Sequence, residues 1–476
     1  MARITLELPE TKGKPVFLTL AESILLEIER GRLKPGDRLP GTRGLAETLQ
    51  INRNTVDAAY QELIMQGWLA SVPSRGTFVA RDLPDSPPKA DPQRSPQISQ
   101  PVADTPVARE PRLQFSDGTP DPRLLPGLEL SRAFRRALST PLSLAPGYGD
   151  PRGSHAVRSA LGRYLTAERG LTTTEDDILV TNGSQMALFV AARTVLSPGQ
   201  VIAVEDPGYP LAWSAFREAG AKIVGIPVDA NGLDVTRLAA VAETEPRLKA
   251  IYVTPHHQYP TTVTLGAGRR LKLLDLAARY GLTLIEDDYD HEYRFESRPV
   301  LPLAARAEVD VSTVYIGSLS KLLSPGLRVG YAVAPPPLLQ EMARRREAID
   351  RQGNQPLEQA IAQLIDDGTL GRHARKARRI YRARRDLLIA AITDKLGNAG
   401  TCTAPAGGLA AWFQAKDEVD TGAWVENAAQ KGLSIMPGGR FSLTPNRAQQ
   451  GLRIGYASLN ENELRHAIGL LAQAKA

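Results

Sequence analysis

A proline-rich stretch, residues 82–112, most strongly constrains how this chain of 476 residues can fold. It reads DLPDSPPKADPQRSPQISQPVADTPVAREPR, and eight of its 31 positions are proline. Proline removes backbone hydrogen-bond donors, and the stretch has too few apolar side chains to form a core. We therefore expect a linker between an N-terminal domain, residues 1–81, and a large domain, residues 113–476. The alternative is an ordered strap on the surface of the large domain.

The composition is that of an ordinary globular protein, with 42% hydrophobic and 23% charged residues. The single cysteine, Cys402, excludes an internal disulfide and fits a reducing compartment. The N-terminus lacks the apolar segment of a signal peptide, and no apolar run reaches membrane-spanning length. These features predict a cytoplasmic protein. Apart from the neighbours His256 and His257, histidines and the cysteine do not cluster at metal-ligand spacing, so we expect no metal site.

The first eighty residues predict three helices followed by two short strands. Apolar residues recur at helical spacing in residues 18–31 and 52–68, and glycines end both segments. A shorter helix is expected over residues 41–50, with Thr42 as its N-cap. Residues 69–80, LASVPSRGTFVA, predict strand, turn and strand. This order of elements is that of a winged helix-turn-helix.

Hydrogen-bonding side chains occupy the positions where such a domain meets DNA. A recognition helix enters the major groove with its N-terminal residues toward the base edges. Phosphate contacts suit the start of the preceding helix and the tip of the wing. The candidate DNA-binding residues are therefore Asn52, Arg53, Asn54 and Thr55 for bases, and Arg43 and Arg75 for the backbone. The alternative is a helical interaction module, because residues 1–81 carry 11 Lys and Arg against 9 Asp and Glu.

Residues 33–79, from LKPGDRLPGTRGLAETLQ to SRGTFV, resemble the winged helix of GntR regulators along their whole length. The resemblance implies binding to double-stranded operator DNA. GntR regulators usually have a glycine in the turn between the two helices, where this chain has Gln50. If that position requires a positive φ, Gln50 carries a modest strain.

From about residue 113 onward, short apolar strands alternate with amphipathic helices, which predicts an α/β fold with a mostly parallel sheet. Ligands of such sheets bind at the carboxyl ends of the strands. The predicted strands cover residues 177–183, 201–207, 221–228, 249–255, 282–289 and 313–321.

Polar residues gather at the carboxyl ends of these strands. Gly183, Ser184 and Gln185 follow one strand at a helix start, which suits an anion. Asp287 and Tyr289 end another strand on one face, and Lys321 follows the next strand. Each feature alone is weak, since such aspartates are usually caps and such lysines are usually solvated. The combination with Ser318, Ser320 and Arg328 indicates pyridoxal 5'-phosphate (PLP), whose aldehyde reacts with a lysine amine.

Residues 113–476 resemble the fold-type I, class I/II aminotransferases, in which a small C-terminal α+β subdomain accompanies the main sheet. The matching stretches include NGSQMAL, EDPGYP, IEDDYD, GSLSKLLSPGLRVG and LRIGYA. The resemblance implies that Lys321 forms the Schiff base and Asp287 holds the pyridinium nitrogen. It also implies that Tyr289 hydrogen-bonds the ring oxygen, that Tyr209 stacks on the cofactor ring, and that Arg453 binds the carboxylate of a ligand. The cofactor phosphate would be bound by Ser184, Gln185, Ser318, Ser320 and Arg328, and Tyr148 would reach the phosphate in the partner subunit.

The combination of both domains resembles the MocR/GabR regulators over nearly the whole chain. In HHQYPTT, Tyr259 and Thr262 stand where aminotransferases carry asparagine and glycine. Tyr259 cannot make the amide hydrogen bond to the ring oxygen, which argues against efficient transamination. Leu211 stands where GABA-responsive members have an arginine, which argues against GABA as the effector.

Residues 372–385, RHARKARRIYRARR, carry eight Lys and Arg and no acid. We favour a solvated surface helix, and the alternative is an additional phosphate-binding face for DNA.

We therefore expect a PLP-dependent transcriptional regulator that works as a homodimer and senses an amino acid or amine through an aldimine at Lys321. One alternative is a functional aminotransferase, and another is a sensor of PLP itself that controls vitamin B6 supply.

Overall fold

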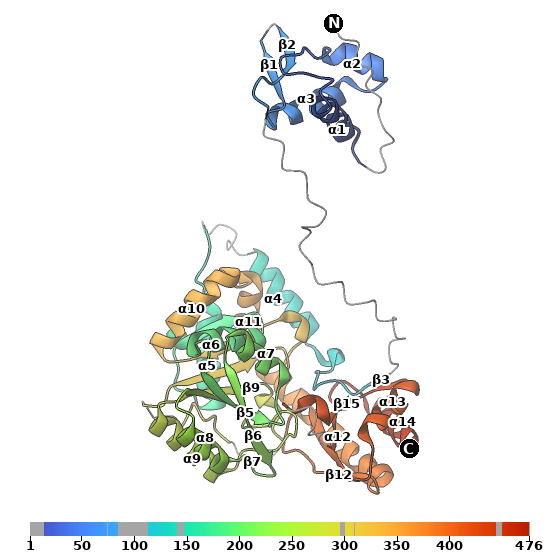
Figure 1. Ribbon diagram of the computed structural model, residues 1–476. Coiled ribbons are helices and arrows are strands. Elements are labelled where there is room, and N and C mark those ends of the chain that lie inside the picture. The colour runs from blue at the N-terminus through green and yellow to red at the C-terminus, as the bar shows by residue number, and fades with distance from the viewer. Residues whose placement is uncertain are drawn as a thin grey trace. The chain divides into compact units, whose positions relative to one another are not determined.

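The computed structural model describes residues 14–73, 75–83, 113–139, 147–295, 300–308, 310–443 and 450–475. The chain divides into two compact units, Met1–Thr105 and Pro106–Ala476 (Figure 1). The predicted linker, residues 82–112, lies outside the described residues except for its first two positions.

The smaller unit contains three helices and an antiparallel hairpin, with the elements α1 (Val16–Glu29), α2 (Thr42–Leu49), α3 (Arg53–Met65), β1 (Leu69–Val72) and β2 (Gly76–Val79). Its core is formed by apolar side chains from all three helices, including Leu20, Ile24, Leu45, Val56 and Tyr60. This arrangement confirms the predicted winged helix-turn-helix. Gly41, not Thr42, is the N-cap of α2, because the helix begins at Thr42 itself.

The turn between α2 and α3 has the predicted strained residue. Gln50 is the C-cap of α2 and has φ 52° and ψ 40°, in the left-handed region. L-residues other than glycine pay a steric cost there, and glycine does not. The chain therefore accepts strain at Gln50 to reverse direction between the two helices.

The larger unit is built on an eight-stranded sheet with the order β4, β11, β10, β9, β8, β5, β6, β7. The strands from β10 to β6 run parallel, whereas β11 and β7 are antiparallel to their neighbours. The six strands that the sequence predicts are confirmed as β4 (Ile178–Thr181), β5 (Val201–Asp206), β6 (Lys222–Asp229), β8 (Leu248–Val253), β9 (Thr283–Asp288) and β10 (Thr313–Ser318). The sequence did not predict the two short antiparallel strands, β7 (Gly232–Leu233) and β11 (Gly330–Val333).

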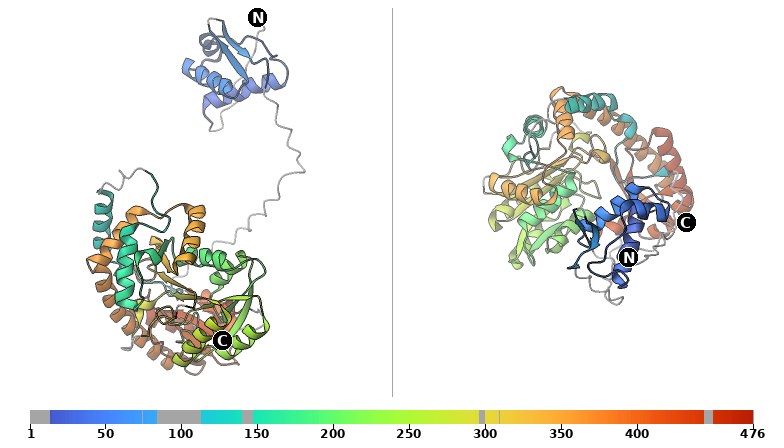
Figure 2. Two further views of the ribbon diagram at one scale, coloured as in Figure 1. Left: turned by 90° about the vertical axis from the view of Figure 1, so that its left-hand side faces the viewer. Right: turned by 90° about the horizontal axis from the view of Figure 1, so that it is seen from above.

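Helices cover both faces of this sheet (Figure 2). Alternate residues of β5 enter different cores: Ile202 and Val204 face one, and Val201 and Ala203 face the other. The first core also receives α6 (Ser184–Val195), α7 (Pro210–Glu218) and α10 (Pro336–Asp350), and the second receives α8 (Val235–Thr244) and α9 (Ala267–Tyr280). Three further helices are α4 (Gly127–Ser139), α5 (His155–Arg169) and α11 (Gln355–Asp366); α5 packs against β4, and α11 packs against both α4 and α5.

The C-terminal part forms a second, smaller layer of strands and helices. A four-stranded antiparallel sheet has the order β12 (Gly400–Cys402), β13 (Ala410–Ala415), β16 (Gly451–Gly455) and β15 (Met436–Pro437). The helices are α12 (Thr369–Leu396), α13 (Thr421–Gln430) and α14 (Glu461–Ala474). The first strand of the larger unit, β3 (Leu113–Gln114), pairs with β14 (Leu433–Ser434), so the segment after the predicted linker joins this layer.

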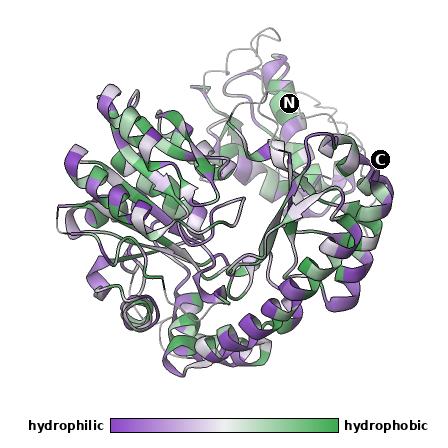
Figure 3. Cartoon of the chain, turned by 90° about the horizontal axis from the view of Figure 1, so that it is seen from below, coloured by the Kyte–Doolittle hydropathy of each residue, from purple (hydrophilic) through white to green (hydrophobic). Residues whose placement is uncertain are grey.

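The helices of the larger unit carry hydrophobic and hydrophilic residues in alternation, as expected when one face is buried (Figure 3). Among the described residues, no helix combines the length and the apolar character that crossing a membrane requires.

Candidate functional site

A cavity opens at the carboxyl ends of three adjacent parallel strands, β8, β9 and β10. Its lining includes six of the predicted site residues, namely Ser184, Tyr209, Asp287, Tyr289, Ser318 and Lys321. Four further residues complete it: Asp117, Tyr252, Thr254 and Tyr259. The tertiary structure thus brings together residues that are up to 204 positions apart, as in the pair Asp117 and Lys321.

Lys321 lies three residues beyond the end of β10 and projects into this cavity. Its Nζ donates a hydrogen bond to the main-chain oxygen of Asp117 at 2.8 Å. Burial lowers the pKa of the Lys321 ammonium group from its usual value, although nearby carboxylates oppose this shift. A lowered pKa increases the fraction of free amine, which is the form that attacks an aldehyde.

Asp287 lies at the end of β9, and only one of its two carboxylate oxygens has a hydrogen-bond partner among the described residues. Tyr252 donates to Oδ2 at 3.0 Å, whereas Oδ1 is buried without a hydrogen-bond partner among the described residues. Burial raises the pKa of Asp287 to about 7. A buried, unpartnered carboxylate oxygen suits a positively charged N–H donor, such as a protonated pyridine ring.

The start of α6 forms an anion-binding corner. Gly183 is the N-cap of α6 with φ 82°, and Arg328 donates from Nη2 to the main-chain oxygen of Asn182 at 3.1 Å. A Cβ atom at Gly183 would come within 2.6 Å of Nη2 of Arg328, so only glycine lets the guanidinium lie this close. A helix N-terminus beside a guanidinium and hydroxyl groups binds phosphate well.

The predicted phosphate residues take different positions at this corner. Ser184 and Ser318 line the cavity, and the hydroxyl of Ser320 is buried without a partner among the described residues. The side-chain amide of Gln185 donates instead to the main chain of Leu211 at 2.9 Å. Gln185 can therefore contribute its backbone N–H from the first turn of α6, but its side chain points elsewhere.

The residues present fit PLP. Lys321 supplies an amine, Asp287 an open carboxylate oxygen for the ring nitrogen, and the α6 corner an anion site. Tyr209 stands at the cavity wall, where an aromatic ring can flank the pyridine. Tyr289 lines the cavity together with Asp287, and its hydroxyl donates to the main-chain oxygen of His257 at 3.0 Å.

Sequence reasoning missed Tyr252, Thr254 and Glu205, which support the cavity from within. Thr254 donates to the buried carboxylate of Glu205 from both its hydroxyl and its backbone N–H. Burial raises the pKa of Glu205 to about 7. The available signal was the strand KAIYVTP, because Tyr252 and Thr254 alternate onto one face just where that strand ends.

Arg453, the predicted partner of a ligand carboxylate, binds a carboxylate of the protein instead. Its Nε donates to Oδ1 of Asp117 at 2.8 Å, and its Nη1 donates to the main-chain oxygen of Pro260 at 2.8 Å. Tyr259 donates from its hydroxyl to Oδ2 of Asp117 at 2.7 Å, and its ring packs against the guanidinium with 4.3 Å between Cζ and the ring centroid. The contact of Arg453 with an effector stays a prediction.

The substituted loop also holds an unusual backbone. Thr262 has φ 64°, the left-handed region that glycine adopts without cost. A β-branched residue rarely occupies this region. Thr262 therefore holds a backbone conformation that suits glycine, and its side chain is strained next to Tyr259 and Pro260.

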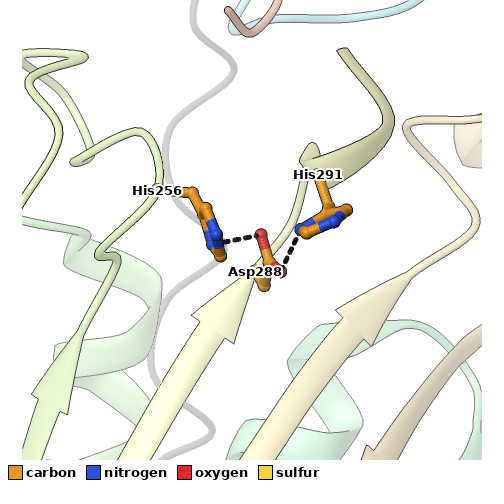
Figure 4. A group of neighbouring side chains, drawn as sticks. All are labelled: His256, Asp288 and His291. Atoms are coloured by element: carbon orange, nitrogen blue, oxygen red, sulfur yellow. Dashed lines mark hydrogen bonds and ion pairs between the residues drawn. The ribbon is translucent and has the colours of Figure 1, made fainter. Parts of the chain in front are cut away.

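His256, Asp288 and His291 form a buried group behind the cavity (Figure 4). Asp288 lies 3.2 Å from Nδ1 of His256 and accepts from Nδ1 of His291 at 2.8 Å. Sequence analysis expected no metal site, whereas the fold brings these three potential ligands within 4.8 Å of one another. The buried guanidinium of Arg169 lies 3.8 Å from Asp288 and also pairs with Glu292, and both histidines help to lower the pKa of Asp288. We therefore assign the group to a hydrogen-bond network that ties the 256–262 loop to the end of β9.

The candidate DNA-binding residues lie on the surface of the smaller unit. Arg43, Asn52, Arg53, Asn54 and Arg75 are exposed, and Thr55 is half-buried. Asn52 is the N-cap of α3 and accepts from the backbone N–H of Asn54 at 2.9 Å. The side-chain oxygen of Asn52 is thus engaged in capping α3, and contact of Asn52 with DNA stays a prediction.

The basic stretch 372–385 forms part of α12, which buries one face. Arg384 is buried and pairs with Asp121 at 2.8 Å, and Arg378 and Arg385 donate to main-chain oxygens of neighbouring segments. Five basic side chains remain exposed, namely Arg372, Arg375, Lys376, Arg379 and Arg382. The arrangement is that of an amphipathic helix, and contact with DNA stays a prediction.

Tyr148 lies outside the cavity of its own chain. Its side chain is 70% exposed, and the guanidinium of Arg351 packs on its ring at 3.9 Å.

The cavity and the fold define a PLP-binding α/β protein of the aminotransferase type, and the separate winged helix-turn-helix makes it a DNA-binding one. Residues 133–471 match the family of class I and II aminotransferases, and residues 18–79 match the gntR family of bacterial regulatory proteins. The chain belongs to the MocR-type regulators, in which these two families are joined. It is a PLP-dependent transcriptional regulator.

Individual relatives agree with this assignment. The probable rhizopine catabolism regulatory protein MocR of Rhizobium meliloti is 32% identical over 97% of this chain and 94% of its own length. The pyridoxine biosynthesis regulator PdxR of Corynebacterium glutamicum is 31% identical over 96% and 95%. Among solved structures, the α-aminoadipate aminotransferase LysN of Thermus thermophilus, in complex with N-(5'-phosphopyridoxyl)-L-leucine, aligns with a TM-score of 0.70 and 28% identity over 76% of this chain and 91% of LysN.

Proposed function

We propose that this regulator senses an amino compound in the cavity around Lys321 and converts its binding into a change of operator affinity. The proposal rests on one observation above all: Lys321, with its lowered pKa, shares a cavity with the open carboxylate oxygen of Asp287. When bound, PLP supplies an aldehyde that reacts reversibly with primary amines.

The residues of the chain have distinct tasks in this proposal. Lys321 would hold the cofactor through its side-chain amine. Asp287 accepts the hydrogen bond of the ring nitrogen and keeps it protonated. Ser184, Ser318 and Arg328 orient the phosphate, and Tyr209 covers the ring.

Fast transamination is not expected of this site. Tyr259 replaces an amide, and its hydroxyl is already committed to Asp117. The strained Thr262 belongs to the same loop. An enzyme must hold its catalytic groups in a productive geometry throughout turnover, whereas a sensor needs only reversible binding. We therefore propose that any transaminase activity is residual.

We propose that the regulator is a homodimer through the larger unit. Large apolar side chains are exposed on α4, α7 and α10, namely Leu128 (60%), Leu138 (66%), Leu211 (55%) and Ile349 (48%). Water-exposed apolar side chains of this size favour an interface. The exposed Tyr148 would reach the phosphate of the other subunit from such an interface, and light scattering of the purified chain measures the mass.

The proposal is tested by finding an effector that changes two measured signals at once. It should change the visible absorbance of the PLP-loaded protein. It should also change the affinity of the protein for its operator, by about 5- to 150-fold for a coupling free energy of about 1–3 kcal/mol. Turnover should stay far below the roughly 10 per second of a median enzyme. Lys321→Ala should bind the operator but lose the response to the effector. Rapid multiple turnover, or an unchanged response in Lys321→Ala, contradicts the proposal.

A second candidate is a sensor of PLP itself, which the similarity to PdxR favours. In that case operator occupancy should follow the PLP concentration without any added amine.

A further inference from the structure

The charges that line the cavity are unusual for a site that is expected to bind amino acids. Of its ten lining residues in the described part of the chain, three are charged: Asp117, Asp287 and Lys321. The cation expected to bind a carboxylate, Arg453, is not among them. It lies behind Asp117 and is 2% exposed.

Asp117 holds Arg453 in place through contacts that leave the guanidinium little freedom. Nε binds Asp117, Nη1 binds Pro260, and Tyr259 covers one face. Burial acts to raise the pKa of Asp117, but Arg453 and Lys321 outweigh it and the pKa is lowered. Asp117 is therefore ionised at neutral pH, and an ion pair already occupies the position where a ligand carboxylate would bind.

The cofactor changes which charges an effector meets. When PLP is bound, Lys321 would hold the cofactor and Asp287 would pair with the ring nitrogen. The remaining charged side chain at the cavity wall is Asp117, whose side chain is 38% exposed. A second carboxylate placed beside it would be repelled, because like charges a few ångströms apart in a partly buried site interact strongly. To reach Arg453 it would have to displace Asp117 from a hydrogen-bonded pair.

We propose that Asp117 sets the specificity of this sensor, and that its effector is a primary amine without a carboxylate on the amino-bearing carbon. Each oxygen of Asp117 accepts one hydrogen bond, from Arg453 or Tyr259, and can accept another from a ligand. Amino alcohols and diamines carry such donors, in a hydroxyl or a second ammonium group. This inference rests on the proposed function and narrows it to one class of effector.

The experiment compares matched pairs that differ only in the carboxylate. PLP-loaded full-length protein is titrated with L-serine against ethanolamine and with L-lysine against cadaverine. Visible absorbance reports binding at the cofactor, and the melting temperature reports it independently. In each pair the decarboxylated amine should bind at least roughly tenfold more tightly.

Variants separate the charge of Asp117 from its shape. Asp117→Asn keeps the size of the side chain but frees Arg453. The affinity for the amino acid should therefore rise, and the preference for the decarboxylated amine should fall roughly tenfold or more. Tyr259→Phe removes one hydrogen bond but keeps the charge, so the preference should persist. Asp229→Asn is the control. It removes an exposed carboxylate that pairs with Arg269 and does not line the cavity, so the preference for the decarboxylated amine should not change.

Each result of this experiment either supports or overturns the inference about Asp117. Equal affinity within the pairs for the wild-type protein overturns the inference, whatever the variants do. An unchanged preference in folded, PLP-loaded Asp117→Asn also overturns the role of Asp117. If PLP is bound but none of the four compounds alters absorbance or melting temperature, the proposed sensing of amines at Lys321 fails, and this inference fails with it. If both members of a pair respond equally, only the inference about Asp117 fails.

Discussion

The guanidinium of Arg453 is bound to the carboxylate of Asp117, with 2.8 Å between Nε and Oδ1, although 336 positions separate the two residues. Asp117 lies three residues after β3, and Arg453 lies within β16. The main-chain oxygen of Asp117 also accepts a hydrogen bond from Lys321. The segment that begins the larger unit is thereby connected directly to the lysine of the cofactor site.

Lys321→Ala should abolish covalent attachment of PLP. Borohydride reduction of the loaded protein should link the cofactor to a Lys321 peptide in the wild type, and mass spectrometry after proteolysis locates it. Lys272→Ala, on the exposed side of α9, is the control that retains the adduct. An adduct of equal yield on another lysine in Lys321→Ala would remove Lys321 from its role.

Asp287→Asn should make the stability of the cofactor-free protein less dependent on pH. The folded pKa of about 7 lies above the unfolded value, so the folded state holds a proton that the unfolded state releases. Stability is therefore greatest at low pH and is lost as the pH rises toward 7. Between about pH 5 and pH 7 the loss from this one group is about 2 kcal/mol, and the variant should lack it.

Urea unfolding of the cofactor-free protein across this pH range measures the effect. The exposed Asp310→Asn is the matched control and should follow the wild type. PLP itself should reduce the pH dependence of the wild type, since the ring nitrogen satisfies the buried carboxylate. A wild-type slope as flat as that of Asp287→Asn contradicts the assignment.

Arg53→Ala and Arg75→Ala should affect DNA binding in different ways. Arg53, at the start of α3, should contribute sequence preference, and its loss should cost about 1–3 kcal/mol on the operator but little on random DNA. Arg75, exposed at the wing, should contact a phosphate. Its loss should therefore weaken binding to operator and to random DNA alike, and should lower the number of counterions released on binding by about one. Binding assays at several salt concentrations measure affinity and salt dependence for both variants, with Arg30→Ala at the C-cap of α1 as the control.

Gln50→Gly should stabilise the smaller unit by about 1 kcal/mol. Gln50 is exposed and holds φ 52°, where glycine is free of the steric cost that glutamine pays. Thr48→Gly, two residues earlier within α2, should destabilise the unit by up to about 1 kcal/mol, because glycine is a poor helix former. Thermal unfolding of the smaller unit within the full chain measures the two changes, and stabilisation by both or by neither contradicts the argument.

The local sequence predicted the elements and their class well. The winged helix and six strands of the main sheet follow from apolar periodicity, because a helix or a buried strand must present its apolar side chains to a core. The positions of Asp287, Ser318 and Lys321 follow from strand ends, since parallel strands bring their carboxyl ends to one edge of the sheet. The short strand β11 was missed because four residues between a turn and a helix show no periodicity of their own.

The sequence by itself thus determined the two-domain plan, the winged helix, the α/β sheet and the residues at the ends of its parallel strands, because each depends on local patterns of side chains. Only the tertiary structure decided that Tyr252 meets Asp287, that Asp288 meets two histidines, and that Asp117 occupies Arg453. Such pairs join segments far apart in the chain, and their partners depend on which strands and loops become neighbours in space. No local spacing encodes that choice, so the charge that an effector meets in this cavity emerges only when the fold is complete.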